Sequence, residues 1–362
     1  MSKSLVTINL VVLNGDKYIL HCLDGVLAQT YLHELIEFNV LDNGSSDGTK
    51  SVIENFKLKI KNSKFFGFKF IEGQKNLGMW PGQEELLKHT NGEYVLTMAV
   101  DVILDKDFVK NAVAIFEKDE KIGGVEPKIY RYELSELRIT NYELKKKIID
   151  TVGFQIYKSR RVVNMGHGEE EKGQFSKEMA IFGVEGAAPM FRRKALEDCR
   201  ISFTGKTREN TGLACGEIFD HDFFWYGDDL DLAWRMNMFG WRQIFSPDVV
   251  AWHDRQTTKG LRKSWSDFIK LRRQIPIKKR RLDWRNTRFT IIKNDYTINI
   301  LKDLPRILKR EIMMFGYIII FEPEVLLEIP NFLRLLPKML KSREEILKRA
   351  VIKPEIIHKW FK

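Results

Sequence analysis

Short apolar runs alternate with amphipathic segments through the first hundred residues of the chain. Runs rich in β-branched residues predict buried strands at 5–13, 36–41, 66–72 and 94–100. Between them, apolar residues spaced three and four apart predict helices over 16–30 and 49–59, the second with Ser46 or Asp47 as its N-cap. Strands that alternate with helices across short connections are typical of a parallel sheet, so the predicted fold class is α/β with a doubly wound, mostly parallel sheet.

The pattern changes after residue 130. The stretches "TVGFQIY" and "RRVVNMG" predict short antiparallel strands, and "VEGAAPMFRR" predicts a further strand followed by a helix at "KALEDC". From about residue 266 onward the chain is helical and basic. The sequence therefore predicts a domain at 1–265 and a basic, amphipathic helical appendage at 266–362.

Cysteine usage and hydropathy favour an intracellular setting. The 362 residues include three cysteines, Cys22, Cys199 and Cys215, and these form no CxxC pair. A disulfide framework is therefore not expected, and we expect the protein to lie in the reducing cytoplasm. No secretory signal opens the chain, and the longest apolar run, Ile312 to Phe321, is too short to span a bilayer.

Positive charge is concentrated at the rear of the chain. Residues 255–285 hold twelve Lys/Arg and two Asp/Glu, a net charge of +10, whereas residues 1–254 carry −5. An amphipathic pattern follows, with Leu301, Leu304, Leu308 and Ile312 near one helical face. Together these features predict peripheral docking on an anionic membrane surface. The alternative is a helical appendage with solvated lysines, and no nucleic-acid motif accompanies the charge. The basic cluster comprises Arg272, Arg273, Lys278, Lys279, Arg280 and Arg281.

Polar residues follow the first two predicted strands. Asn14 and Gly15 come after the first, and Asp42 opens the segment "DNGSSD" after the second. Ligands of open α/β sheets bind at the carboxyl ends of strands, where helix N-termini also favour anions. Asp42 could accept hydrogen bonds from a ribose hydroxyl or a base N–H, which predicts nucleotide binding without a P-loop or a GxGxxG motif. The alternative for any one of these acids is a local cap of an Asx-turn.

The ordered motifs of residues 5–255 resemble glycosyltransferase family 2. They are "VVLNGDKYILHCLDGVLAQT", "VLDNGSSDGT", "NLGMWPGQEELLKHTNGEYVLTMAVDVILDKDFV" and "GEIFDHDFFWYGDDLDLAWRMNMFGWRQIFSPDVVAWH". The resemblance implies a GT-A fold and inverting sugar transfer from a nucleotide-sugar donor. It also implies that Asn76 and Gly78 belong to a donor-side loop, so that Asn14, Asp42, Asn76 and Gly78 form the predicted nucleotide-binding set.

A departing nucleotide diphosphate needs positive charge, and Mg²⁺ or Mn²⁺ with carboxylate ligands would supply it. Asp101 follows the apolar strand "EYVLTMAV". The resemblance implies that Asp101 is the metal-binding acid of a triplet, although this chain reads Ala99-Val100-Asp101 and keeps only its last carboxylate. The resemblance also offers His253 as a second contact to the metal or to the diphosphate. A hydrogen-bonded histidine at the rim of the site is the alternative for His253.

The segment "FFWYGDDLDLAWR" places three acids within four residues. The resemblance implies that Asp229 is the general base and that Asp228 replaces a glutamate near the acceptor. Asp231 is expected to hold either the loop or a neighbouring arginine such as Arg235. The alternative is an acidic helix N-terminus stabilised by the helix dipole. Trp225 lies in an aromatic wall suited to sugar faces, and Gly186 allows close approach of the backbone to an acceptor. Core packing and tight sheet packing are the alternatives for these two positions.

The sequence therefore predicts a cytoplasmic transferase that moves a sugar from a UDP- or dTDP-sugar to a hydroxyl of a glycan or lipid-linked acceptor. The tail and the segment "FDHDFFWYGDDLDLAWR" look most like rhamnosyltransferase-type members that build bacterial surface polysaccharides. Two alternatives stay open: a catalytically inactive relative that binds sugar nucleotides, and a basic membrane or nucleic-acid adaptor.

Overall fold

The structure is a computed structural model, and it describes residues 4–135, 137, 144, 146–201, 216–255 and 265–362. The first half alternates strands and helices as predicted, with boundaries within a few residues of those expected. Helix α2 begins one residue later than a cap at Asp47 implies, because Gly48 is its N-cap, although the Asp47 carboxylate accepts a hydrogen bond from Thr49 N. The elements are β1 (Val6–Val12), α1 (Ile19–Leu27), β2 (Ile36–Asp42), α2 (Thr49–Lys61), β3 (Gly67–Glu72), α3 (Met79–Leu87), β4 (Tyr94–Met98), β5 (Val102–Leu104), α4 (Phe108–Phe116) and β6 (Ile122–Arg131).

The middle of the chain contains the predicted antiparallel pair, β8 with β9. The strand predicted over 184–193 is shorter than expected: only β11 is a strand, and residues 184–189 precede it as irregular chain. The elements are β7 (Ile149–Thr151), β8 (Phe154–Ile156), β9 (Val162–Asn164), β10 (Met179–Ile181), β11 (Met190–Arg192), α5 (Arg193–Asp198), α6 (Asp228–Met238) and β12 (Arg242–His253).

A mostly parallel sheet forms the centre of the molecule. Among the described residues it has ten strands, along the path β10-β12-β6-β11-β4-β1-β2-β3, with β5 and β7 attached at the side. The pairs of β1 with β2, β1 with β4, β2 with β3 and β6 with β12 are parallel, while β11 runs antiparallel between β4 and β6. Strands β1 and β2 are buried along their whole length. Their carboxyl ends therefore place Asn14 and Asp42 side by side at one edge.

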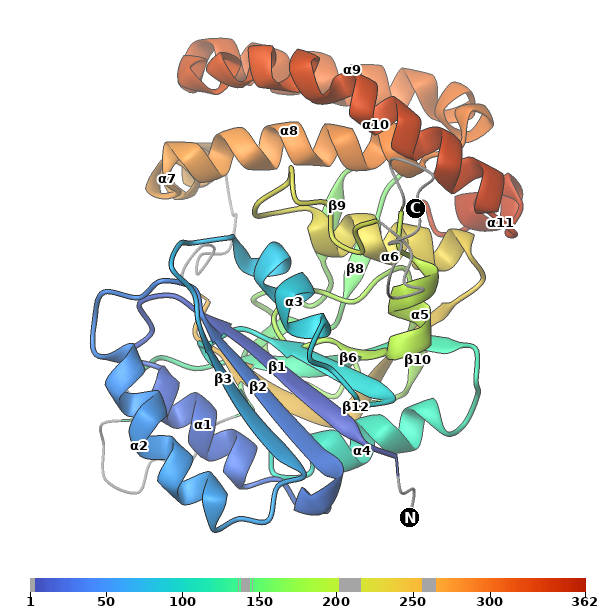
Figure 1. Ribbon diagram of the computed structural model, residues 1–362. Helices are drawn as coiled ribbons and strands as arrows, with labels where there is room; N and C mark the ends of the chain where they lie inside the picture. The colour runs from blue at the N-terminus through green and yellow to red at the C-terminus, as the bar shows by residue number, and fades with distance from the viewer. Residues whose placement is uncertain (1–3, 136, 138–143, 145, 202–215, 256–264) are drawn as a thin grey trace.

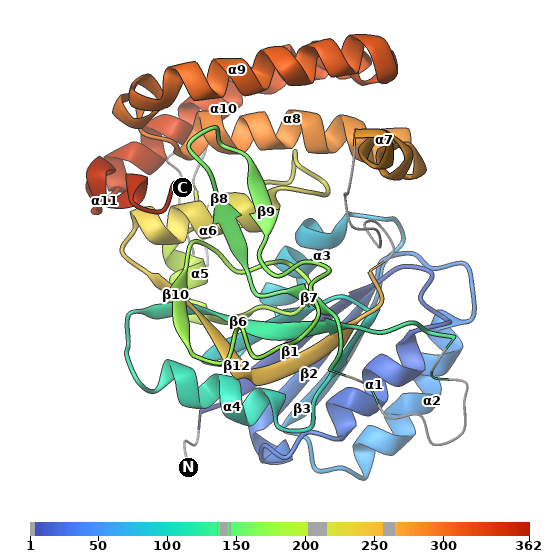
Figure 2. The same cartoon turned by 180° about the vertical axis from the view of Figure 1, so that it is seen from behind.

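The rear of the chain forms a layer of helices on one side of the sheet, with α9 farthest from it (Figures 1 and 2). None of the helices that the structure describes is long and apolar enough to cross a membrane. Prolines 305 and 337 lie inside helices that continue past them. The elements are α7 (Trp265–Gln274), α8 (Ile277–Asn294), α9 (Thr297–Phe321), the 3-10 helix η3 (Pro323–Glu328), α10 (Ile329–Arg349) and α11 (Pro354–His358).

Hydrophobic packing continues between the two predicted parts of the chain. Phe223 stacks against Phe289 of α8, with ring centroids 6.3 Å apart, in a cluster that includes Leu335 and Met339 of α10. Near the end of the chain, Phe361 packs edge-on against Trp234 of α6. The division at residue 265 stays a prediction, and its two sides share buried side chains. Cys22 and Cys199 are free, buried thiols, and Cys215 lies outside the described residues.

Candidate active site

Hydrogen bonds join the two polar loops at the carboxyl ends of β1 and β2. Asn14 N donates to Ser45 Oγ at 2.8 Å, and Ser46 N donates to Asn14 Oδ1 at 2.8 Å. Asp42 is fully buried, and its Oδ1 accepts a hydrogen bond from Ser45 N at 2.9 Å. Its Oδ2 accepts none from the described residues and faces Lys50 Nζ at 3.8 Å. A buried carboxylate oxygen without a donor fits a base N–H or a ribose hydroxyl.

The predicted donor-side loop belongs to the same cluster. Asn43 Nδ2 donates to Asn76 Oδ1 at 3.1 Å and to Gly78 O at 3.0 Å, and Asn43 Oδ1 accepts from Leu77 N at 2.9 Å. Gly78 has a φ of 96°, and a Cβ at this position would lie 2.4 Å from Phe224 O. Only glycine fits both the backbone conformation and the space. The loop that holds Gly78 therefore contacts the loop that precedes the predicted base.

Asp101 and His253, the predicted metal residues, lie next to each other. His253 Nε2 is 3.4 Å from Asp101 Oδ2, and His253 Nδ1 is 2.9 Å from Asp150 Oδ2. Burial alone would lower the pKa of His253, but the carboxylates of Asp101 and Asp150 outweigh burial and raise it to about 10. Burial alone would raise the pKa of Asp101, but the adjacent His253 outweighs burial and lowers it. The imidazole is held between two carboxylates.

These residues fit a divalent cation that takes most of its ligands from a substrate. Asp101 supplies a hard carboxylate oxygen, and Asp150 orients the imidazole of His253 in the way that carboxylates orient metal-binding histidines. Within the described ranges, no group of three or more His, Cys, Asp or Glu side chains could hold a metal ion. The remaining ligands would therefore have to be phosphate oxygens and water.

A run of ion pairs leads from this pair of residues toward the predicted base. Arg255 Nε lies 2.9 Å from both oxygens of Asp150, and its Nη2 donates to Glu185 Oε1 at 2.7 Å. Burial would lower the pKa of Arg255, but Glu185 and Asp150 raise it above its usual range. Glu185 is next in sequence to Gly186, whose N–H donates to Asp229 Oδ2 at 3.2 Å. The predicted metal residues and base thus belong to one connected network.

Asp229 lies in the first turn of α6. Besides the bond from Gly186, its Oδ1 accepts a hydrogen bond from Leu230 N at 2.8 Å. Burial, with a smaller contribution from the negative charge of Glu185, raises the pKa of Asp229 to about 7. A Cβ at Gly186 would lie 3.0 Å from Asp229 Oδ2 and 2.8 Å from the ring of Trp80, so a side chain there would displace the carboxylate. A carboxyl group with this pKa can take up a proton near neutral pH.

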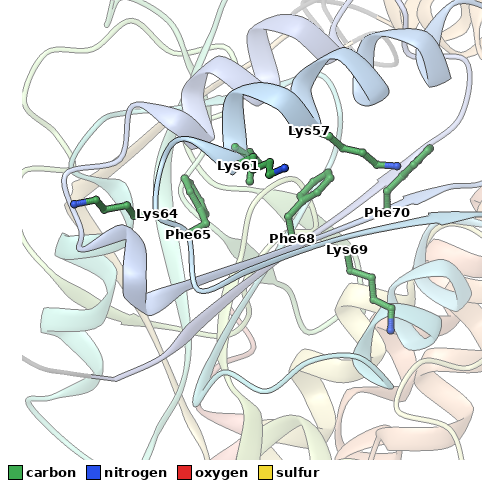
Figure 3. Close-up of a pocket in the computed structure, with 8 residues that line it drawn as sticks. Lys57, Lys61, Lys64, Phe65, Phe68, Lys69 and Phe70 are labelled. Atoms are coloured by element: carbon green, nitrogen blue, oxygen red, sulfur yellow. The ribbon is translucent and has the colours of Figure 1, made fainter.

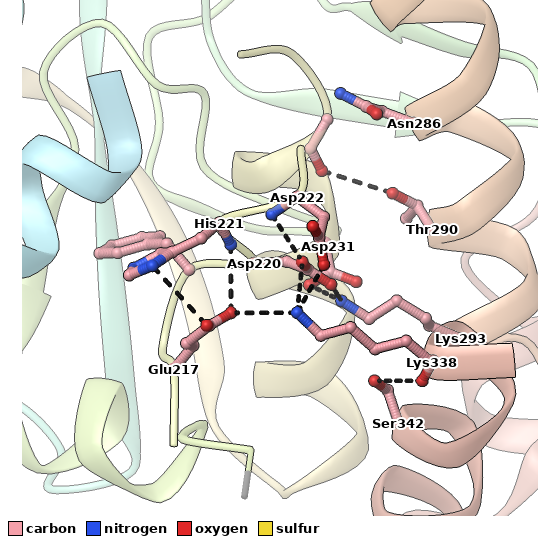
Figure 4. Close-up of polar contacts among 12 residues, drawn as sticks. Glu217, Asp220, His221, Asp222, Asp231, Asn286, Thr290, Lys293, Lys338 and Ser342 are labelled. Atoms are coloured by element: carbon pink, nitrogen blue, oxygen red, sulfur yellow. Dashed lines mark hydrogen bonds and ion pairs between the residues drawn. The ribbon is translucent and has the colours of Figure 1, made fainter. Parts of the chain in front are cut away.

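The other two acids of the motif have different surroundings. Asp231 is buried and pairs with Arg235 at 2.9 Å, as the sequence predicted, and also with Lys293 of α8 at 3.0 Å (Figure 4). Asp228 is fully buried, and both of its oxygens lack a hydrogen-bond partner among the described residues. Burial and the adjacent Asp229 raise the pKa of Asp228 well above its ordinary value. Its predicted contact with an acceptor stays a prediction, because no part of Asp228 reaches the surface here.

A strained loop precedes these acids. Phe224 and Tyr226 have φ angles of 62° and 69°, a conformation that costs roughly 1–2 kcal/mol for each non-glycine residue. Asn286 of α8 holds the loop: its Nδ2 donates to the carbonyl oxygens of Phe223, Trp225 and Tyr226 at 2.9, 2.9 and 2.7 Å. Figure 4 shows Asn286 and Thr290 facing this region from the helix.

Trp225, a predicted acceptor contact, is 37% exposed. The ammonium group of Lys279 lies 3.7 Å from the centre of its ring, and the ring of Tyr226 stacks on it with centroids 5.2 Å apart. The ring is thus fixed in position with part of its surface open. Its contact with an acceptor sugar stays a prediction.

Sequence reasoning missed four residues of this region. Asp150, Glu185, Arg255 and Asn286 connect elements up to 105 positions apart, as the bond between Arg255 and Asp150 does. Arg255 had one local signal, its place two residues after His253 at the end of β12. Glu185 had a similar signal, its place directly before Gly186. Asp150 lies in a three-residue strand and Asn286 in a helix of the predicted appendage, and no motif marks either of them.

The basic cluster of residues 272–281 is not the free cationic surface that the sequence led us to expect. Several of its arginines pair with internal acids: Arg272 and Arg280 lie 3.1 and 3.3 Å from Glu322, and Arg281 lies 2.9 Å from Glu328. Glu322 is fully buried. Much of this charge therefore holds α7 and α8 to η3, so the cluster as a whole does not form the open anion-binding surface that was expected.

An open cavity of about 550 Å³ lies elsewhere, between α2 and β3 (Figure 3). Lysines and phenylalanines line it, and none of the predicted site residues does. Lysines on an edge strand such as β3 also hinder its pairing with another chain. The lining residues are Lys57, Ile60, Lys61, Lys64, Phe65, Phe68, Lys69 and Phe70.

Comparison with known proteins gives consistent relatives. A family model described as Glycosyl transferase family 2 matches residues 7–200. The poly-beta-1,6-N-acetyl-D-glucosamine synthase of Staphylococcus epidermidis is 24% identical over 239 residues, covering 66% of this chain and 47% of the relative. That of Staphylococcus aureus is 26% identical over 247 residues, covering 68% and 49%. The chain spans about half the length of these curated relatives.

Solved structures share the fold. Mannosyltransferase PcManGT from Pyrobaculum calidifontis, in complex with GDP-Man and Mn²⁺, superposes with a TM-score of 0.51 at 18% identity, over 99% of this chain and 85% of that one. Staphylococcus aureus TarS 1-349 in complex with UDP gives 0.52 at 15% identity, over 98% and 86%. The likeness at these identities concerns the fold alone, and the predicted GT-A fold with its helical C-terminal region is confirmed.

Proposed function

We propose, from the premise that this chain belongs to glycosyl transferase family 2, that it transfers a sugar from a nucleotide-diphosphate donor to a hydroxyl of a glycan or lipid-linked acceptor. One observation carries the proposal. Contacts connect the predicted metal residue to the predicted base, and each link is short enough to fix the position of the next. The residues, in order, are Asp101, His253, Asp150, Arg255, Glu185, Gly186 and Asp229.

In this proposal Asp229 removes the proton from the acceptor hydroxyl as that oxygen attacks the donor sugar. A general base works best when its pKa lies near the working pH, and burial raises the pKa of Asp229 to about 7. The hydrogen bond from Gly186 N holds one carboxylate oxygen in place. The other oxygen is bonded to the helix backbone at Leu230, so the group is fixed from both sides.

The donor would lie at the carboxyl ends of β1 and β2. Asp42 would offer to the nucleoside its Oδ2, which accepts no hydrogen bond from the described residues. The loops of Asn14 and of Gly78 are hydrogen-bonded to the segment that follows Asp42. Asp101 and His253 would hold Mg²⁺ or Mn²⁺, which when bound neutralises the charge of the leaving diphosphate. The structure of the neighbour PcManGT is a complex with Mn²⁺, which supports a divalent cation here.

The finer parts of the proposal concern the sugars and the setting. Inversion at the anomeric carbon follows from a single in-line attack assisted by one base. The proposed donor is a UDP- or dTDP-sugar. If the protein is a rhamnosyltransferase, the donor is a dTDP-deoxyhexose. Trp225 and Gly186 would line the acceptor side. The printed names of the curated relatives, poly-beta-1,6-N-acetyl-D-glucosamine synthases, support the synthesis of a polysaccharide. We propose that the product is a cell-surface polysaccharide and that the place of action is the cytoplasmic face of the membrane.

Thermal-shift measurements with UDP-, dTDP- and GDP-sugars, each with Mg²⁺ or Mn²⁺, test donor binding. The sugar that binds is then used in transfer assays, and nuclear magnetic resonance of the product gives the anomeric configuration. Asp229→Asn should abolish transfer and keep donor binding, whereas the exposed control Asp248→Asn should behave like the wild type. Full activity of Asp229→Asn would overturn the assignment of the base. Donor binding without transfer to any acceptor would favour the inactive relative.

A further inference from the structure

Helix α9 presents a long apolar stripe on the outside of the molecule. Seven large apolar side chains recur at spacings of three or four, which places them on one face. At 1.5 Å per residue the stripe is roughly 30 Å long. Each member is at least 36% exposed, and Ile312 is 71% exposed. A contiguous row of this kind differs from scattered surface leucines and marks an interaction site. The members are Ile298, Leu301, Leu304, Leu308, Ile312, Phe315 and Ile319.

The inner face of α9 packs against the protein. Tyr317 and Ile318 are buried with Val325 of η3, beside Phe268 of α7 and Trp284 of α8. Both views show α9 as the outermost helix of its layer (Figures 1 and 2). The stripe is therefore the outer side of a helix whose opposite side is already anchored.

Cations follow the stripe along one flank. Lys302, Arg306 and Lys309 each come one residue after a stripe position or Pro305, so they lie about 100° around the helix from the apolar row. Lys302 and Arg306 also line a cavity of about 480 Å³ where α9 meets α11 and the turn between β8 and β9. Its other lining residues are Lys158, Asp303, His358, Lys359 and Phe361.

The positive charge of this cavity is largely uncompensated. Its one acid, Asp303, is 1% exposed and already bonded to Arg160 Nη1 at 2.6 Å and to His358 Nε2 at 2.9 Å. Arg306 reaches Asp303 only at 3.8 Å, with a side chain that is 62% exposed. In the ranges that the structure describes, no ion pair joins the lysines of the cavity to an acid. The cavity thus contrasts with the neutralised arginines of α7 and α8.

We propose that the outer face of α9 docks on an anionic phospholipid bilayer, with the apolar stripe at the boundary of head groups and acyl chains and the cavity binding a lipid phosphate. Charge complementarity selects this occupant, because uncompensated cations flank the apolar row on the side where head groups would lie. The inference deepens the proposed function, since it rests on that function for the idea that the acceptor is at a membrane. It also places the docking surface on α9 instead of on the basic cluster of residues 272–281.

Flotation of the full chain with vesicles tests the inference. The probes are phosphatidylcholine vesicles and vesicles that also contain phosphatidylglycerol, each at low and high salt. The wild type should bind the anionic vesicles and lose binding as salt rises. At about 1 kcal/mol per cation, Lys302→Gln/Arg306→Gln should weaken binding by about thirtyfold. Leu308→Ser/Ile312→Ser should also weaken binding, to neutral and anionic vesicles alike.

The matched control is Lys61→Gln/Lys64→Gln, which removes the same charge from the cavity of Figure 3 and should leave vesicle binding unchanged. An equal loss in this control would mean that net charge, and not the α9 surface, drives binding, and would overturn the proposal. Two further results would overturn the proposal. One is a wild-type protein that does not bind vesicles. The other is a wild-type dimer, measured by light scattering, that the Leu308→Ser/Ile312→Ser variant does not form. Inorganic phosphate that binds the cavity without any vesicle binding would also overturn it.

The same variants separate this inference from the proposed function. Lys302, Arg306, Leu308 and Ile312 lie outside the predicted active site, so donor binding by thermal shift and transfer to a water-soluble acceptor should persist in them. Vesicle binding that fails while transfer persists defeats the docking surface alone. Vesicle binding that persists while every donor and acceptor fails defeats the proposed transferase alone.

Discussion

Asn286 ties the helical layer to the predicted base, and its replacement by alanine should impair transfer more than binding. The side-chain amide donates to three carbonyl oxygens of residues 223–226, the loop that leads directly into Asp228 and Asp229. Two residues of this loop, Phe224 and Tyr226, have unfavourable positive φ angles. Without the amide, the loop loses the partner that offsets this strain.

The expected size of the effect follows from the geometry. One amide group has two N–H bonds to share among the three carbonyls, which lie at 2.7 to 2.9 Å. At about 1 kcal/mol net for each hydrogen bond, Asn286→Ala should cost about 2 kcal/mol of loop positioning. If the loop must keep its shape in the transition state, that cost lowers kcat by about thirtyfold. The KM for the donor should change little, because Asp42, Asn14 and Asn76 are untouched.

Steady-state kinetics and thermal denaturation of two variants would check this reasoning. Thr290→Val is the control: it lies one turn along α8, is equally buried, and contacts the same loop only through a 3.4 Å bond to Gly227 O. We expect the control to keep wild-type kcat. A kcat for Asn286→Ala within twofold of the wild type, in a protein that melts normally, would refute the idea that the amide positions the base. Equal losses in both variants would refute it too.

Other predictions concern charge. The specificity constant kcat/KM should rise as the pH increases through about 7, because Asp229 then loses its proton. A pH profile that is flat from pH 5 to 9 would contradict the role of Asp229 as the general base. Glu185→Gln removes a charge that raises this pKa, so the midpoint should move to lower pH. EDTA and Asp101→Asn should both stop transfer, with Mn²⁺ restoring only the EDTA-treated wild type. Lys293→Met leaves buried Asp231 without one partner and should lower the free energy of unfolding by about 3–5 kcal/mol in urea titrations, whereas Lys341→Met, at an exposed position of α10, should not.

The sequence predicted correctly those elements that depend on the residue pattern of their own short segment. The strands β1, β2 and β4 are short apolar runs, and their pattern fixed both their type and the edge where Asn14 and Asp42 meet. The pair of Asp231 with Arg235 follows from a spacing of four on a helix. The antiparallel pair predicted at "TVGFQIY" and "RRVVNMG" has the same origin in a short hairpin.

Ion pairs and hydrogen bonds between residues far apart in the sequence could not be predicted from it. Composition made the arginines of 272–281 look free, because their partners Glu322 and Glu328 lie some fifty positions later. Asp150 has no motif, yet it touches both His253 and Arg255. Burial of Asp228 likewise depends on how α6 packs, which its own acidic pattern does not reveal. The roles of the predicted site residues themselves stay predictions until variants are assayed.

The shared packing between α8, α10 and the loop before α6 bears on how the protein matures during synthesis. The strands that the structure describes, the predicted nucleotide loops and the predicted base all precede residue 255 in the chain, so a ribosome completes them first. The amide that shapes the loop, and the ammonium groups of Lys293 and Lys338 that neutralise its neighbouring acids Asp220 and Asp222, emerge last. A nascent chain would therefore complete the predicted donor-binding loops well before the loop that leads to the predicted base could take its final shape.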